Sequence, residues 1–303
     1  MHPPGPAFDR DDVGTSYAAP KVARIAAHIQ SILPAEPSLL YRALIVQSAR
    51  WPTWAEEVLD KLRRPVAPLT DEEKSQLRQS ASQAIRCLGY GKPDLGRATE
   101  NTDHRTTLIT SGESSVRAGE CHIYQVPIPA AMRQQADEFD IRIDVTLSYV
   151  AQPRRTRRNL RRYLSTWVDW KTSKLGEGLN DFRVRAMKDT ENSGVALPGE
   201  VLPWTLHENQ DWGLIRDFRR NCGTVQKDWA VVRSNALPDH FCIAVVGHEG
   251  WSRDPDSRAR YTMAVTFEIL GQEINIYDPL RTAVLELQAE VEGEVEAEAE
   301  VDE

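Results

Sequence analysis

The sequence GTSYAAP at residues 14–20 places Ser16 at the head of a hydrophobic helix, and it decides the fold expected for the residues that follow. Apolar residues recur at spacings of three and four up to Ile32, which predicts a buried helix from Ser16 to about Leu33. Pro20 is compatible with the first turn, where backbone N–H groups have no partner within the helix. Those N–H groups and the positive end of the helix dipole can stabilise an oxyanion, so Ser16 is a candidate nucleophile. The alternative is an ordinary core helix that begins with a capping Ser or Thr.

The longer stretch GTSYAAPKVAR, residues 14–24, resembles the nucleophile motif of subtilisin-like serine peptidases, the subtilases. Residues 34–49, PAEPSLLYRALIVQSA, look like the next helix of this family. Residues 88–94, LGYGKPD, followed by Ala98, look like the glycine turn that closes its catalytic domain. The resemblance implies a serine endopeptidase that hydrolyses a polypeptide substrate through an acyl-enzyme formed on Ser16, with no cofactor.

The other catalytic residues of that family have no counterpart in this chain. Subtilases carry their triad in the order Asp, His, Ser, and only fifteen residues precede Ser16. The asparagine oxyanion donor of the family also precedes the serine, whereas the first asparagine here is Asn101. His28 lies about 18 Å along the same helix, and a general base must lie within about 3 Å. Four nearby candidates in a proline-rich and acidic start are not expected to replace the missing partners: His2, Asp9, Asp11 and Asp12.

The resemblance therefore implies that residues 1–103 are the C-terminal part of a subtilase catalytic domain, mostly helical and inactive alone. An N-terminal subtilase segment outside this chain would supply the Asp and the His. The parallel strands that would cover the first helix are missing, so Ile25, Ile29 and Ile32 are expected to face solvent or a partner.

Further helices are predicted in the same part of the chain. The apolar residues at about 38–49 favour a second helix, and the prolines of residues 51–69 favour a short helix with loops. Thr70 and Glu73 have the spacing of a capping box, which opens a polar helix that runs to about Cys87. Gly89 is expected to end that helix.

From about His104 the apolar period changes to two, which predicts strands. Clear examples are residues 122–127, 141–147 and 261–269, separated by clusters of Gly, Pro and Asp. The pattern favours an antiparallel β-sandwich over residues 104–285, and an α+β chain as a whole. Some bacterial subtilases carry a similar β-domain after the catalytic domain. The alternative function is a non-catalytic binding or regulatory module built on this sandwich, with Ser16 as a relic.

Six arginines between Arg154 and Arg162 form a second candidate site beside Tyr163 and Trp167. Clustered arginines with aromatic residues can hold phosphates and stack bases, so nucleic-acid binding is a rival hypothesis. A solvated connection between strands is the favoured interpretation. The glycines at 89–92 lack the spacing of a phosphate-binding loop, and nucleic acid is not an expected partner.

Composition predicts an intracellular, cytoplasmic protein. The 303 residues are 41% hydrophobic, which is enough for two domains with cores of their own. No apolar run has membrane-spanning length, and no signal peptide opens the chain. The four cysteines have no CxxC spacing, so reduced thiols are expected. A zinc site on His240 and Cys242 with Cys121 or His122 is not favoured, and no metal is expected.

The formal charge of −8 comes from the C-terminal end of the chain. Residues 286–303 hold nine acidic residues and no basic ones, and the rest of the chain has 37 basic residues against 36 acidic ones. Glu alternates there with Val or Ala, and no aromatic residue is present. Such a segment repels itself and buries little apolar surface, which predicts a disordered acidic tail. A tail that binds a partner is the less favoured alternative.

Overall fold

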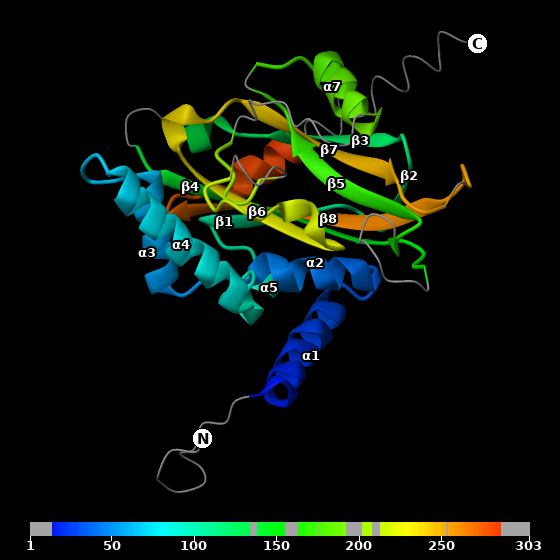
Figure 1. Ribbon diagram of the computed structural model, residues 1–303, viewed down its shortest axis with the longest axis horizontal. Helices are drawn as coiled ribbons and strands as arrows, with labels where there is room; N and C mark the ends of the chain where they lie inside the picture. Colours follow the sequence, from blue (N-terminus) through cyan, green and yellow to red (C-terminus); the bar gives the residue numbers. More distant parts are fainter. Residues whose placement is uncertain are drawn as a thin grey trace, which may run out of the picture.

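A computed structural model describes residues 14–133, 138–154, 163–174, 176–191, 202–207, 213–252 and 254–285. The chain has a mixed α+β architecture, in which an N-terminal helical region precedes two antiparallel sheets. Figure 1 shows helices α2 to α5 against one side of the sheets and α7 against the other.

The helical region contains five helices: α1 (Thr15–Ile32), α2 (Ser38–Ser48), α3 (Thr53–Arg63), α4 (Asp71–Leu88) and α5 (Leu95–Thr99). The predicted helices at 16–33 and 38–49 are confirmed. The capping box that opens α4 is also confirmed, because Thr70 Oγ1 accepts from the Glu73 N–H at 3.2 Å and the Glu73 carboxylate accepts from the Thr70 N–H at 2.8 Å. Gly89, with φ of 56°, ends the helix as expected.

Five strands form the first sheet, in the order β1 (Arg105–Ile109), β8 (Arg258–Leu270), β4 (Asp140–Val150) and β6 (Val225–Arg233), with β2 (Ser114–Arg117) also paired to β8. The second sheet has the order β3 (Cys121–Pro127), β7 (His240–Glu249) and β5 (Thr166–Thr172). All pairings are antiparallel, and the three strands predicted from the period of two are confirmed.

One hydrophobic core fills the space between the two sheets. Ile141, Ile143 and Val145 of β4 reach it from the first sheet, and Trp170 and Val245 reach it from the second. Helix α7 (Leu179–Glu191) packs on the outer face of the second sheet through a separate apolar cluster, formed by Phe182, Ala186, Cys242, Ala244 and Val246. Short 3₁₀ turns at Ala130–Arg133, Arg220–Cys222 and Ser234–Ala236 connect the strands.

The other face of the first sheet is polar, and helix α2 covers it. Alternate residues of β4 point away from the hydrophobic core, and Arg142, Asp144 and Thr146 among them are buried under the helix. Gln47 of α2 donates to the Asp144 carbonyl at 2.9 Å and accepts from the Thr146 hydroxyl. A polar sheet face that would ordinarily meet water is therefore an internal interface between the helical region and the sheets.

Helix α1 is only half covered. Ile25 and Ile29 are buried against Leu40, Leu44 and Ala264, so the prediction that they lie uncovered was wrong. Ile32 is 52% exposed, as expected. Residues 14–24 are all exposed, and Figure 1 shows this end of α1 projecting away from the body.

Candidate functional site

Ser16 lies in the first turn of α1, on the exposed end of the helix. The Gly14 carbonyl accepts from the N–H groups of Tyr17 at 3.1 Å and Ala18 at 3.2 Å, which closes the first turn. The N–H groups of Thr15 and Ser16 have no acceptor among the described residues. No side chain caps this terminus, so its partial positive charge faces solvent beside the Ser16 hydroxyl.

Among the residues that the structure describes, neither an imidazole nor a carboxylate forms a hydrogen bond with Ser16. His28 lies further along α1 and is exposed there. The candidates His2, Asp9, Asp11 and Asp12 lie outside the described residues. Ser16 therefore has two features of a nucleophile, exposure and free N–H groups, and lacks a base within the described part of the chain.

A buried Asp–His pair that no sequence motif indicates lies elsewhere in the fold. His248 Nε2 of β7 is 2.7 Å from Asp169 Oδ1 of β5, and the imidazole stacks on Trp167 with ring centroids 3.7 Å apart. Asn221 donates to the other carboxylate oxygen at 3.2 Å. Burial by itself raises the pKa of Asp169, but the attraction of His248 and its hydrogen bond outweigh this and lower the pKa to about 2.

This pair cannot serve Ser16 in the present arrangement. Asp169 and His248 lie on the face of the second sheet that points away from the shared core, whereas α1 packs beyond the opposite face of the first sheet. Both sheets therefore separate the pair from Ser16. The two residues are 79 positions apart in sequence and meet only through the pairing of β5 with β7.

A second polar cluster fixes α2 to the first sheet. The Asp144 carboxylate is fully buried and accepts from Arg50 at 3.1 and 2.9 Å and from Arg142 at 3.1 Å. Arg142 also donates to Glu56 at 2.8 Å, and Arg50 donates to Glu268 at 3.1 Å. Burial alone raises the pKa of Asp144, but the surrounding cations outweigh it and hold the pKa well below its usual value.

Lys227 of β6 completes this cluster by capping the C-terminal end of α2. Its Nζ donates to the carbonyl oxygens of Val46 at 3.1 Å, Gln47 at 3.0 Å and Ala49 at 2.7 Å. Asp144 Oδ1 lies 3.5 Å from the same nitrogen. Burial lowers the pKa of Lys227 well below its usual value, although Asp144 opposes the shift. The cation satisfies carbonyls that have no partner within the helix and complements the helix dipole.

The glycine turn at residues 88–94 packs directly against the residues that follow α2. Arg50 and Lys92 exchange two backbone hydrogen bonds, at 3.1 and 2.9 Å, and Trp51 Nε1 donates to the Gly89 carbonyl at 2.8 Å. Gly91 has φ of 103°, and a Cβ atom there would lie 2.2 Å from the Arg50 carbonyl oxygen. Only glycine fits this position.

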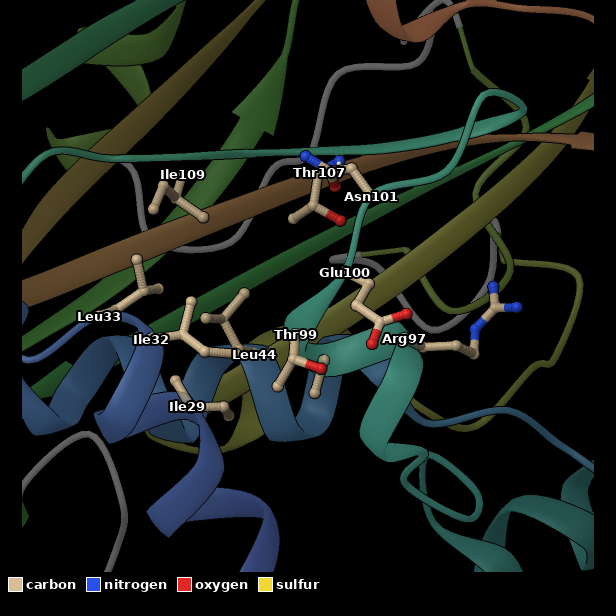
Figure 2. A pocket seen from close by; sticks show the side chains of 11 residues that line it. Ile29, Ile32, Leu33, Leu44, Arg97, Thr99, Glu100, Asn101, Thr107 and Ile109 are labelled. Atoms are coloured by element: carbon tan, nitrogen blue, oxygen red, sulfur yellow. Dashed lines mark hydrogen bonds between the residues drawn. The ribbon is translucent and has the colours of Figure 1, made fainter.

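A pocket of about 170 Å³ lies beyond the other end of α1. Figure 2 shows the apolar side chains of Ile29, Ile32 and Ile109 on one side of it and the polar side chains of Arg97 and Glu100 on the other. Its nearest residue on α1 is thirteen positions from Ser16, which corresponds to about 20 Å along a helix. The pocket is therefore not a cleft beside the candidate nucleophile.

The remaining candidates from the sequence are placed as follows. Arg154 lies over the Trp251 ring at 5.9 Å, and the other five arginines of the run lie outside the described residues, as does the acidic segment 286–303.

All four cysteines are free thiols, and Cys242 is buried under α7. In the described ranges, no group of three or more His, Cys, Asp or Glu side chains could hold a metal ion. No described helix has the length and hydropathy needed to cross a membrane.

No protein-family model matches the chain. A curated protein of Sinorhizobium fredii (strain NBRC 101917 / NGR234), the uncharacterized protein y4bN, is 34% identical to it over 145 residues. The matched stretch covers 48% of this chain and 28% of that protein. The match therefore spans less than a third of the length of the relative.

Proposed function

We propose that this chain supplies the nucleophile of a subtilisin-like serine endopeptidase and requires a separate segment for activity. The observation that carries the proposal is the position of Ser16, exposed in the first turn of α1 and within the GTSYAAP motif, beside N–H groups that have no acceptor among the described residues. In this proposal the helices up to residue 103 are the C-terminal part of the catalytic domain. The two antiparallel sheets over residues 104–285 are its C-terminal β-sandwich.

The proposed chemistry follows from this geometry. Ser16 Oγ would attack the scissile carbonyl of a polypeptide, and the backbone N–H of Ser16 would donate to the oxyanion that forms. A histidine from the separate segment would take the hydroxyl proton, and an aspartate would orient that histidine. Without them the hydroxyl stays protonated at neutral pH. Because triad members act as a unit, the chain alone is expected to be inactive.

The exposed end of α1 offers a surface for that segment. Tyr17 is 56% exposed and Val22 is 39% exposed, and the neighbouring alanines at positions 18, 19 and 23 are exposed as well. An apolar helix face open to solvent is typical of an interaction surface. The match to y4bN, which is the longer protein, is consistent with this chain corresponding to one part of a larger protein.

Labelling with a fluorophosphonate, which reacts with activated serines, tests the proposal. The chain alone is expected to stay unlabelled. The same chain joined to the segment encoded immediately upstream, if that segment carries Asp and His motifs, is expected to be labelled at Ser16 and to cleave casein. Ser16→Ala should abolish labelling, whereas Ser31→Ala, on the same helix, should not. Labelling of the isolated chain at Ser16 would show that no separate segment is needed.

The same experiment separates the alternative function. A binding or regulatory module built on the sheets predicts no labelling of Ser16 in any arrangement, joined or alone. The buried contacts of Asp144 with Arg50 make the sheets a support for the helical region, which is compatible with either role. The exposure of Ser16 in its motif favours the peptidase.

A further inference from the structure

Helix α4 and the loop at residues 216–217 form a polar groove of about 840 Å³. Four cations line it: Lys74, Arg78, Arg86 and Arg216. Two carboxylates line it as well, and one of them, Asp71, is fully exposed and lies 3.8 Å from Lys74. Four cations and two carboxylates, Asp71 and Asp217, give the lining a formal charge of +2. The groove therefore carries an excess of positive charge, although most of the chain is close to neutral.

The packing of α4 explains why its cations gather on one side. Ala81, Ala84 and Ile85 bury the opposite face of the helix against Trp51 and Leu59. The loop wall is attached to α4, because the Ser82 hydroxyl donates to the Arg216 carbonyl at 3.5 Å and the Arg86 guanidinium lies over the Phe218 ring at 5.4 Å. The Nε atom of Arg78 is buried and has no hydrogen-bond partner within the described residues. The groove thus has defined walls and an unused donor.

We propose that the acidic C-terminal segment of this chain, residues 286–303, docks in the groove along α4. The segment follows directly on the last described residue, Leu285, and carries nine acidic and no basic residues. Eighteen extended residues reach about 60 Å. A compact chain of this size has a radius of gyration of about 19 Å, so the groove is within reach.

The spacing of charges supports this occupant. From Glu290 to Asp302 every second residue is acidic. An extended backbone would therefore present these carboxylates on one side, about 6.7 Å apart. On α4, Lys74, Arg78 and Arg86 are separated by four and eight residues, which corresponds to about 6 and 12 Å along the helix axis. The two rows of charge are therefore opposite in sign and similar in spacing. The docked segment would exclude other acidic ligands from the groove.

Zero-length cross-linking of the full chain with a carbodiimide tests the proposal, because the reagent joins a lysine amine to a carboxylate only at contact distance. Lys74 is the lysine of the groove, and Lys21, Lys61 and Lys92 are exposed controls elsewhere. Mass spectrometry is expected to find residues 286–303 joined to Lys74 at least five times more often than to any control lysine. Raising the salt from 50 to 500 mM should lower this yield several-fold, because exposed charges are screened.

Two variants and one mixing experiment sharpen the outcome. Arg78→Glu with Arg86→Glu should reduce the cross-links at Lys74 at least five-fold, whereas Arg258→Glu with Arg260→Glu, at exposed positions of β8, should not change them. Cross-links spread evenly over the lysines, or none at Lys74 in the unmodified chain, would overturn the proposal. Mixing isotope-labelled and unlabelled chains reveals links between two copies, and links found only between copies would also overturn it. The result is independent of whether Ser16 is catalytic.

Discussion

Replacing Asp144 by Asn is expected to destabilise the chain strongly, because Asp144 is the anion that holds α2 on the first sheet. Its carboxylate is fully buried and contacts Arg50, Arg142 and Lys227. The Asn side chain is nearly the same size but carries no charge. The substitution therefore leaves three cations close together with one fewer counter-ion, and it opens no cavity.

The magnitude follows from the contacts that remain. Removing one partner of a buried ion pair costs about 3–5 kcal/mol, because the other charge stays buried without compensation. Here Arg142 keeps Glu56, Arg50 keeps Glu268, and Lys227 keeps its three carbonyl oxygens. We therefore expect a loss of about 3 kcal/mol in the free energy of unfolding, at the lower end of that range. This loss is a large part of the typical free energy of unfolding of a protein, which is about 5–15 kcal/mol.

Urea unfolding followed by circular dichroism measures the effect, and the same strand offers a control. Asp140 also lies on β4 and pairs with Arg64 and Arg233, but its side chain is 28% exposed. Asp140→Asn should cost less than about 1 kcal/mol, as is usual for exposed pairs. If Asp144→Asn were no more destabilising than Asp140→Asn, the buried charge cluster would not be what fixes α2 to the sheet.

Two further measurements address the turn after α4 and the buried pair of the second sheet. Gly91→Ala should destabilise the chain by more than about 2 kcal/mol, because φ is positive and the added Cβ meets the Arg50 carbonyl. Gly112→Ala, where φ is also positive but the space is open, should cost about 1 kcal/mol. Equal costs in urea unfolding would contradict the steric argument. The pKa of Asp169 is lowered to about 2, so its ionised side chain contributes to the free energy of unfolding above about pH 4. This contribution is lost between about pH 4 and 2. Asp169→Asn should therefore flatten the acid side of the stability profile over that range, and an unchanged slope would show that the pair with His248 does not stabilise the fold.

The secondary structure could be predicted because its signals are local. The capping box of Thr70 and Glu73, the terminating Gly89 and the period of two in β4 each depend on a few neighbouring residues. The coverage of β4 could not be predicted in this way. Arg142, Asp144 and Thr146 alternate with apolar residues in the same pattern whether water or a helix covers them. What covers a polar sheet face depends on residues about a hundred positions away.

For the candidate sites, too, local features could be predicted and contacts between distant residues could not. A contiguous motif placed Ser16 at the start of a helix, and the structure has it in the first turn of α1. Asp169 and His248 belong to no motif, since their contact depends on the register of two strands that are distant in sequence. The burial of Ile25 and Ile29 was missed for a related reason, because α2 and α5 cover part of the helix face that the sequence left without a partner.

The distribution of contacts bears on how the proposed peptidase would assemble. Lys227 and Asp144 fix the C-terminal end of α2, and Gly91 fixes the turn that packs beside it, so this part of the helical region is rigidly attached to the sheets. The end of α1 that carries Ser16 has no such attachment to the described part of the chain, since residues 14–24 are all exposed. A segment that brings the catalytic Asp and His of the proposed peptidase would thus meet a rigid helical region and an exposed helix end that carries Ser16. Its docking on α1, rather than a rearrangement of the sheets, would be the step that completes the site.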